Sequence, residues 1–231
     1  MKMNRWLQDL LNVLLPQECH VCGAKLAPHE RFACSHCLAQ LPRTGYHRRN
    51  PNPMEERFAG QFPFERATGH FFYTRDSALS TLIQDMKYRS FPDIGEMLGH
   101  TAASELFATG FFSGIDLIMP VPMHWAKQIR RGYNQTHHIA VGISQATGIP
   151  VILSLKAVRP HKTQTAMTKE QRLVNTAGLF ALRHPEEVEG RGVLLVDDIC
   201  TTGSTLRSAA ESILAAAPGC RLSLMSIGVT F

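Results

Sequence analysis

The sequence predicts an α/β fold in which helices cover both faces of a mostly parallel β-sheet, preceded by a small cysteine-rich segment. Two observations predict this fold. Continuous apolar runs alternate with segments of helical periodicity, which is typical of parallel strands buried on both faces. The chain has 231 residues, of which 44% are hydrophobic and 19% charged, enough for a substantial core.

The first predicted strand is ATGHFFYT (67–74). A helix is expected at 78–88, because its leucines, isoleucine and methionine recur at intervals of three and four residues. GEMLGHTAASELFA (95–108) predicts a second helix, and the continuous apolar run IDLIMPV (115–121) predicts a strand. The helix expected at 134–148 ends at a glycine, which favours helix termination.

The second half of the chain continues this alternation. We expect strands at 151–158, 178–182, 192–198 and 221–231. A short helix is expected at 168–176, because Thr168 and Gln171 form a capping-box pattern. The helix expected at 205–219 carries leucine, alanine and isoleucine on one face.

Before this domain, two CxxC pairs are separated by eleven residues. The four cysteines are Cys19, Cys22, Cys34 and Cys37. Four thiolates at this spacing predict a structural Zn²⁺ site. Disulfides or unrelated thiols are the alternatives, and a cytosolic location disfavours disulfides. His20 and His36 could also coordinate, but four cysteines complete the shell, whereas Cys200 and Cys220 are expected to be small buried residues.

We therefore expect a leading amphipathic helix and a zinc ribbon in residues 1–41, a linker or covering arm in 42–66, and the α/β domain in 67–231. The N-terminus weakly resembles a signal peptide. Asp9 and Asn12 interrupt its apolar stretch, however, and no small-residue cleavage site follows. No apolar run approaches the roughly 20 residues of a membrane-spanning helix, so a cytoplasmic protein without a membrane span is expected.

Positive charge is concentrated in one segment. The formal net charge of the chain is +5, but residues 120–175 alone carry +7, from eight lysines and arginines against the single acid Glu170. This distribution indicates an anionic ligand, either a phosphorylated small molecule or a nucleic-acid backbone. The alternative is an ordinary solvated basic surface.

The most specific motif is VLLVDDICTTGST, from Val193 to Thr205. Ionised carboxylates are almost never buried without a partner, so Asp197 and Asp198 are expected to serve a ligand at the carboxyl end of the sheet. The following loop leads into a helix whose first N–H groups can hold a phosphate, and Gly203 lets the backbone approach it. A ribose 5-phosphate fits both halves, because its hydroxyls suit the acids and its phosphate suits the loop.

This motif resembles the phosphoribosyl pyrophosphate (PRPP) motif of type I phosphoribosyltransferases. The resemblance implies that Asp197 and Asp198 bind the ribose 2- and 3-hydroxyls as the catalytic acids, with Mg²⁺ accompanying the pyrophosphate. It also implies a 5-phosphate loop made of Thr201, Thr202, Gly203, Ser204 and Thr205.

Together with the four-cysteine ribbon, the segments VPMHWAKQIRRGYNQT (121–136) and KTQTAMTKEQRLVNTAGLF (162–180) resemble the ComF family. These are competence-associated, amidophosphoribosyltransferase-like proteins, including the GntX-type members. The resemblance implies a type I phosphoribosyltransferase-like fold and a cytoplasmic role in DNA uptake and natural transformation. It further implies contact with incoming single-stranded DNA and with the DNA-uptake machinery.

The basic residues of these two segments suit a PRPP ligand. By resemblance, Lys127, Arg130 and Arg131 form a pyrophosphate loop, and Lys162 belongs to a flexible, basic active-site loop. Arginine supplies a rigid fork of donors for phosphate oxygens, and lysine a point charge. Each of them could instead be an ordinary surface cation, and Gln135 could cap the following helix.

The sequence supports functions of different classes. The first is a PRPP-binding ComF-type protein that handles single-stranded DNA through the ribbon and the arm. The alternative is an enzyme of nucleotide metabolism, in which a nucleobase or amine attacks ribose C1 of PRPP and expels pyrophosphate. A regulatory protein without turnover is a third possibility, and the acceptor and the oligomeric state are left open. Basic residues interleaved with aromatic ones would support contact of the arm with DNA, and the arm offers Arg43, Tyr46, Arg48, Arg49, Arg57, Phe58, Phe62 and Phe64.

Overall fold

The structure is a computed structural model that describes residues 17–123, 125–158 and 178–230. The expected leading helix, the expected helix at 168–176 and Lys162 lie outside the described residues. Within the described ranges, no helix combines the length and the hydropathy that crossing a membrane requires.

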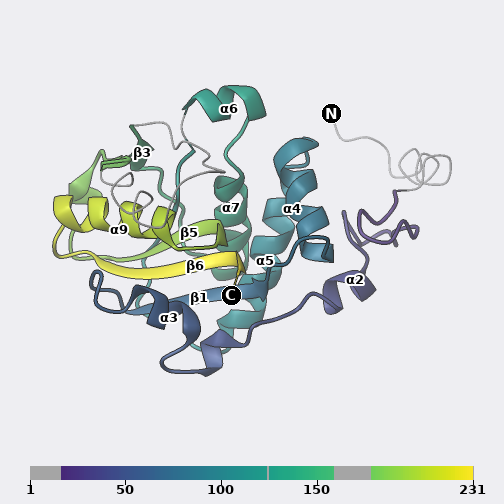
Figure 1. Ribbon diagram of the computed structural model, residues 1–231, viewed down its shortest axis with the longest axis horizontal. Coiled ribbons are helices and arrows are strands. Elements are labelled where there is room, and N and C mark those ends of the chain that lie inside the picture. Colours follow the sequence, from purple (N-terminus) through teal and green to yellow (C-terminus); the bar gives the residue numbers. More distant parts are fainter. Residues whose placement is uncertain (1–16, 124, 159–177, 231) are drawn as a thin grey trace.

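Four parallel strands form the central sheet, in the order β1-β6-β5-β2 (Figure 1). The strands are β1 (Arg66–Phe72), β6 (Arg221–Val229), β5 (Gly192–Cys200) and β2 (Leu117–Pro120). Almost every residue of β5 and β6 is buried, because helices cover both faces of the sheet. The expected fold, a mostly parallel sheet between helical layers, is confirmed.

Each face of the sheet has its own hydrophobic core. One face is covered by α4 (Ala78–Tyr88), α5 (Asp93–Phe107) and α7 (Gln135–Thr147). The other face is covered by α3 (Pro53–Phe58) and α9 (Ser204–Ala216). Along β5, Leu194 and Val196 belong to the first core and Val193 and Leu195 to the second, as the two-residue period of a strand requires.

Helices α5 and α7 pack with their backbones in contact through two glycines. A Cβ added to Gly99 would lie 2.2 Å from the carbonyl oxygen of Ile139, and one added to Gly142 would lie 2.0 Å from that of Glu96. Neither distance leaves room for a side chain. The two glycines therefore set how closely α7 can approach α5.

The start of α7 is tied to the end of β2. Asn134 Nδ2 and Thr136 Oγ1 both donate to the carbonyl oxygen of Val121, at 3.2 Å and 2.5 Å. Asn134 occupies the N-cap position, but its side chain makes no capping hydrogen bond. These contacts fix Gln135 at the carboxyl edge of the sheet.

Two of the expected strands lie outside the central sheet. They form β3 (Leu155–Ala157) and β4 (Phe180–Leu182), which pair antiparallel in a separate two-stranded sheet. Both are shorter than the sequence pattern predicts. Val151, the first residue of the strand expected at 151–158, makes only an isolated bridge to Ile118 of β2. A 3₁₀ turn, η2 (Pro185–Glu187), lies between β4 and β5.

The arm at 42–66 contains two short elements that the sequence analysis did not expect, η1 (Tyr46–Arg48) and α3. A capping box starts α3. The Asn52 side chain accepts the N–H of Glu55, and the Glu55 carboxylate accepts the N–H of Asn52.

The aromatic side chains of the arm pack inward. Tyr46 is 4% and Phe58 1% exposed, and Phe62 and Phe64 pack against the same core. The expectation that these rings face DNA is therefore wrong. They are instead part of the hydrophobic core beside α9, where burial stabilises them more than solvent exposure would.

Candidate functional site

The acid pair lies near the end of β5. Asp197 is 8% exposed and Asp198 6%. Asp198 continues the row of Leu194 and Val196, which faces α4 and α7, whereas Asp197 continues the alternate row. Asp198 Oδ1 accepts the backbone N–H of Ile199 at 2.6 Å, and Asp197 Oδ1 accepts that of Asp198 at 2.8 Å.

Asp198 is ion-paired to a lysine that the sequence analysis did not single out. Lys87, near the end of α4, places Nζ 2.6 Å from Asp198 Oδ2, and Gln135 Nε2 donates to the same oxygen at 2.9 Å. Burial raises the pKa of Asp198, but the Lys87 charge and the two donors outweigh burial and hold this pKa below its ordinary value. Asp198 is therefore ionised at neutral pH.

The other acid has the opposite character. Burial, with the neighbouring charge of Asp198, raises the pKa of Asp197 to about 7. Near neutral pH the pair thus holds one fixed negative charge on Asp198 and a second carboxyl that can gain or lose a proton. A group with such a pKa is suited to proton transfer.

The loop after β5 is open to solvent. Thr201 and Thr202 are exposed, Ser204 and Thr205 partly exposed, and Gly203 buried. Gly203 has φ +78°, and a Cβ there would lie 2.7 Å from the Phe58 ring, so both conformation and space require glycine. Gly203 at the N-cap has no side chain to cap α9, and the Ser204 N–H lies 3.4 Å from Thr202 Oγ1, so the helix N-terminus lies beside the exposed threonines.

Arg57 of α3 holds this loop from behind. Its Nη1 donates to the carbonyl oxygen of Thr201 and lies 3.4 Å from that of Cys200, and its Nη2 donates to the carbonyl oxygen of Thr230 at 2.7 Å. Cys200 is the last residue of β5, Thr201 follows it, and Thr230 follows β6. Arg57 therefore fixes the loop by binding its backbone carbonyls. The expectation that Arg57 faces DNA is wrong.

The segment expected to form a pyrophosphate loop is a short helix, α6 (Trp125–Arg131). Lys127 and Arg130 lie on this helix. Only four residues separate α6 from the end of β2, so these positions lie at the carboxyl edge of the sheet, where the acid pair also lies.

Arg131 is joined to the acid pair through Gln135. Arg131 Nη1 donates to Gln135 Oε1 at 2.6 Å, while Gln135 donates to Asp198. The Arg131 guanidinium also lies over the ring of Tyr88, 5.3 Å from its centroid. Two neighbours on α4, Lys87 and Tyr88, thus contact the same polar network.

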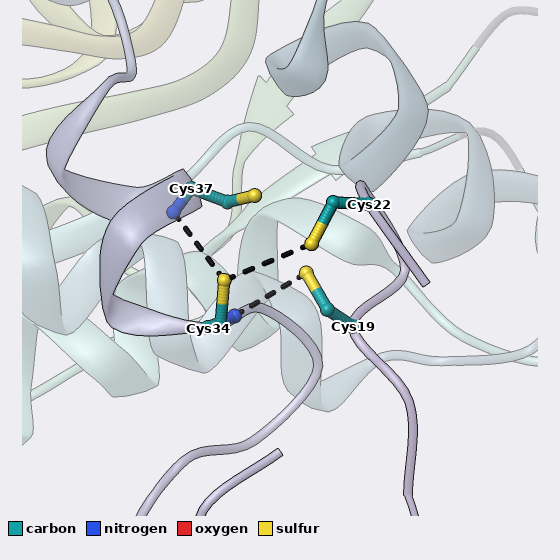
Figure 2. A group of neighbouring side chains, drawn as sticks. All are labelled: Cys19, Cys22, Cys34 and Cys37. Atoms are coloured by element: carbon teal, nitrogen blue, oxygen red, sulfur yellow. Dashed lines mark hydrogen bonds between the residues drawn. The ribbon is translucent and has the colours of Figure 1, made fainter. Parts of the chain in front are cut away.

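The structure brings the four ribbon cysteines together (Figure 2). Their sulfur atoms all lie within 4.8 Å of one another, and Cys22 Sγ and Cys34 Sγ are 3.9 Å apart. A zinc ion with Zn–S bonds of about 2.3 Å separates tetrahedral sulfurs by about 3.8 Å, so the donor set fits Zn²⁺. All six cysteines are free, so the disulfide alternative is not realised.

The electrostatics of the cluster favour a thiolate at Cys19. Burial raises the pKa of Cys19, but hydrogen bonds from the backbone N–H groups of Cys34 and Cys22 outweigh burial and lower it to about 6. Burial and the neighbouring thiols instead raise the pKa of Cys37. Metal binding requires thiolates, and one is already favoured here without a metal charge.

The ribbon is anchored to α4 by a hydrogen bond between two side chains. His20 Nδ1 lies 2.6 Å from Asp85 Oδ2, and Asp85 is only 3% exposed. The His20 ring also packs edge-on against Phe91, with centroids 4.7 Å apart. The His20 ring therefore contacts α4 and Phe91, and it lies two residues before Cys22 of the cysteine cluster.

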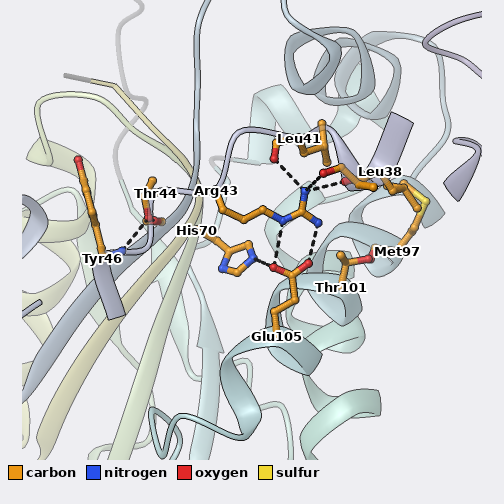
Figure 3. A network of polar contacts seen from close by, with 11 residues as sticks. Leu38, Leu41, Arg43, Thr44, Tyr46, His70, Met97, Thr101 and Glu105 are labelled. Atoms are coloured by element: carbon orange, nitrogen blue, oxygen red, sulfur yellow. Dashed lines mark hydrogen bonds and ion pairs between the residues drawn. The ribbon is translucent and has the colours of Figure 1, made fainter. Parts of the chain in front are cut away.

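A second anchor joins the ribbon helix α2 (Ser35–Ala39) to α5 (Figure 3). Arg43 Nη1 donates, at 2.8 Å in each case, to the carbonyl oxygens of Leu38, Ala39 and Leu41. The same guanidinium donates to both carboxylate oxygens of Glu105, at 3.1 Å and 2.7 Å. Arg43 thus closes the end of α2 onto α5, and the expectation that it faces DNA is wrong.

Glu105 also accepts from a buried histidine. His70 Nε2 lies 2.9 Å from Glu105 Oε2, and the His70 side chain is 1% exposed. Burial lowers the pKa of His70 to about 4, although the charge of Glu105 opposes this. His70 Nδ1 has no hydrogen-bond partner, which fits a neutral ring that donates through Nε2.

Asp93, Glu96 and His138 form another group whose ligand atoms lie within 4.8 Å of one another. His138 pairs with Glu96 at 3.0 Å, and Arg31 lies 3.6 Å from Asp93. The hydrogen bond between His138 and Glu96 and the contact of Arg31 with Asp93 account for the geometry.

Comparison with known sequences places the chain among phosphoribosyltransferase-like proteins. The phosphoribosyl transferase domain family matches residues 117–225. Competence protein F of Haemophilus influenzae is 30% identical over 178 residues, which cover 75% of this chain and 74% of that protein. The DNA utilization protein YhgH of Escherichia coli K12 is 27% identical, over 85% of this chain and 77% of that protein.

Two further similarities cover smaller shares. Competence protein ComFC of Bacillus subtilis is 29% identical over 42% of this chain and 38% of that protein. The solved structure of the glutamine PRPP amidotransferase from B. subtilis, complexed with ADP and GMP, matches 62% of this chain at 20% identity and a TM-score of 0.42. Only 30% of that enzyme's chain is covered.

The buried His70 predicts a defined pH dependence of stability. The unfolded chain binds a proton at a pKa of about 6.5, whereas folded His70 resists protonation down to about 4, so folding stability falls as pH drops through this window. His70→Gln keeps an N–H donor for Glu105 but does not titrate. We expect wild type to lose up to about 3 kcal/mol relative to this variant between pH 6.5 and 4, as measured by urea unfolding.

His100→Gln, on the exposed side of α5, controls for the loss of one imidazole from the unfolded chain. Parallel pH profiles for wild type and His70→Gln would contradict the buried, neutral state of His70.

Proposed function

Because the chain belongs to the ComF family, we propose that it acts in DNA uptake during natural transformation and binds PRPP or a related phosphoribosyl ligand. The observation that carries this proposal is a single juxtaposition at the end of β5. A buried acid pair, Asp197 and Asp198, lies directly before an open loop that leads into the N-terminus of α9. The relatives named above support the biological role, because their names refer to competence and to DNA utilization.

In the proposed complex, the ribose hydroxyls bind the acid pair and the 5-phosphate binds the loop from Thr201 to Thr205. The exposed Thr201 and Thr202 hydroxyls and the first N–H groups of α9 supply donors for phosphate oxygens. The hydrogen bond from Arg57 to the Thr201 carbonyl supports phosphate binding by this loop, because a loop that is already ordered binds a ligand at a smaller entropic cost.

The pyrophosphate of the ligand would extend toward the basic residues of α6. Mg²⁺, which phosphoryl compounds commonly carry, would supply charge that neutralises the pyrophosphate oxygens. The ribbon cysteines Cys19, Cys22, Cys34 and Cys37 would hold a structural Zn²⁺, and the closeness of their sulfur atoms supports this part of the proposal.

The second candidate function is catalysis of phosphoribosyl transfer to a nucleobase or an amine. The raised pKa of Asp197 favours it, because a carboxyl that titrates near pH 7 can take a proton from an attacking nitrogen. Measuring PRPP consumption with candidate bases, ammonia donors and DNA would separate this enzyme from a protein that only binds PRPP.

Single-stranded DNA binding is the other part of the proposed function. Arg48 and Arg49 of the arm are exposed, unlike Arg43 and Arg57. Exposed aromatic side chains lie instead near the site, with Tyr88 73% and Trp125 62% exposed. The bases of single strands stack on exposed rings beside arginines. We therefore expect the bases to contact the side of the molecule that carries Tyr88 and Trp125.

The first prediction concerns PRPP. Asp197→Asn replaces one carboxylate oxygen with an NH₂ donor and abolishes the charged form, without leaving Lys87 unpaired. We expect PRPP affinity to fall at least about tenfold, because hydrogen bonds to charged groups are strong. Isothermal titration calorimetry with Mg²⁺ measures this affinity. Asp116→Asn, the same change at the opposite edge of the sheet, serves as the control. Unchanged affinity in Asp197→Asn would refute the proposed ribose site.

The second prediction concerns zinc. Wild-type protein is expected to hold about one zinc ion per chain, and Cys22→Ser to lose it and melt at a lower temperature, because the ribbon depends on metal to fold. Elemental analysis and thermal unfolding measure the two effects. Cys220→Ser removes a buried cysteine outside the cluster and should keep the metal. Purified wild type without zinc would end the assignment.

The third prediction concerns DNA. Affinity for single-stranded DNA is expected to fall steeply with salt, and the double variant Arg48→Gln, Arg49→Gln to reduce the slope of log K against log salt by up to about 1.4. Fluorescence anisotropy with a labelled oligonucleotide measures it. Arg191→Gln, at the start of β5, is the control. A salt-independent affinity would count against a DNA-binding role.

A further inference from the structure

Lys87 is bound to Asp198, the carboxylate that a ribose hydroxyl of the proposed ligand would need. Its ammonium lies 2.6 Å from Asp198 Oδ2, and its side chain is 18% exposed. Gln135 donates to the same oxygen, so Oδ2 already accepts two donors, which fills its two lone pairs. A ligand hydroxyl can therefore bind Oδ2 only if one of these donors leaves.

Of the two donors, Lys87 is the one free to move. Gln135 is held on its other side by Arg131, at 2.6 Å, and it lies at the start of α7 between two residues bound to Val121. Lys87 has a flexible four-carbon stem, and Asp197 is the second acid whose charge acts on it. An ammonium that leaves Asp198 needs another anion, because an unpaired charge is costly in a half-buried site.

We propose that Lys87 is an exchangeable counter-ion that selects ligands with a diphosphate at ribose C1. Without ligand it neutralises Asp198. When the ligand binds, the ribose hydroxyls replace the ammonium on Asp198, and the ammonium pairs with the diphosphate oxygens. This inference rests on the proposed function and names the chemistry that the site prefers.

The proposed move of Lys87 from Asp198 to the ligand explains why a diphosphate would strengthen binding. A ribose 5-phosphate displaces Lys87 without offering it an anion near C1, so its binding includes the cost of an unpaired ammonium. PRPP supplies that anion, and the ion pair is replaced rather than lost. The preference for PRPP over ribose 5-phosphate should therefore depend on the charge of Lys87.

The test is calorimetric titration of PRPP and of ribose 5-phosphate, each with Mg²⁺, into wild type, Lys87→Met, Lys87→Gln and Lys87→Arg. For the two uncharged variants we expect the ratio of PRPP affinity to ribose 5-phosphate affinity to fall about tenfold or more, since a charge-assisted bond is lost for only one ligand. Lys87→Arg should keep most of the ratio. Lys87→Gln retains a donor for Asp198 and gives a second, milder variant if Lys87→Met does not fold.

Arg191→Met is the charge control, because it removes a cation at the opposite end of β5. If Lys87 only stabilises the fold, both ligands weaken by the same factor, and the inference is overturned. An unchanged ratio overturns it as well. If wild type binds neither ligand, the proposed phosphoribosyl site itself fails, which is a different result from wild-type binding with an unaltered ratio.

Discussion

Two adjacent carboxylates at the end of a buried strand impose the constraint on which the candidate site depends. Each must be neutralised, protonated or matched with donors, because an isolated charge is strongly disfavoured inside a protein. The structure meets this need unequally: Lys87 and Gln135 compensate Asp198, and Asp197 has a raised pKa. Helices α4 and α7 carry the compensating residues, and both pack in one core on the same face of the sheet.

Much of the fold could be predicted because it depends on local pattern. The continuous apolar runs at Val193–Val196 and in β6 indicated strands buried on both faces, and both are central strands of the sheet. Short elements were harder. The pattern Asn-Pro-Met-Glu at Asn52–Glu55 is a capping signal that could have revealed α3. Pairing partners are tertiary information, so the separate β3–β4 sheet could not be read from its two short strands.

In the candidate site, too, some residues could be predicted from the sequence and others could not. The two acids and the loop that follows them are contiguous in sequence, so their residue types alone predicted a ligand site. Lys87 and Arg57 lie more than a hundred residues before Asp198 and Thr201, on helices that do not carry the motif. In sequence, Lys87 is one cation beside the apolar face of a helix, and Arg57 is one of several arginines in an irregular arm. Only packing shows that one points at a carboxylate and the other at backbone carbonyls.

The pairing of β1 with β6 has a consequence for what counts as the smallest working unit. The matched family segment starts at residue 117 and contains neither β1, α3 nor α4. A chain truncated to that segment would turn β6 into an edge strand with a row of unsatisfied backbone groups, which is prone to aggregate. The motif from Val193 to Thr205 thus lies in the second half of this chain, whereas β1, α3 and α4, which support it, lie in the first half.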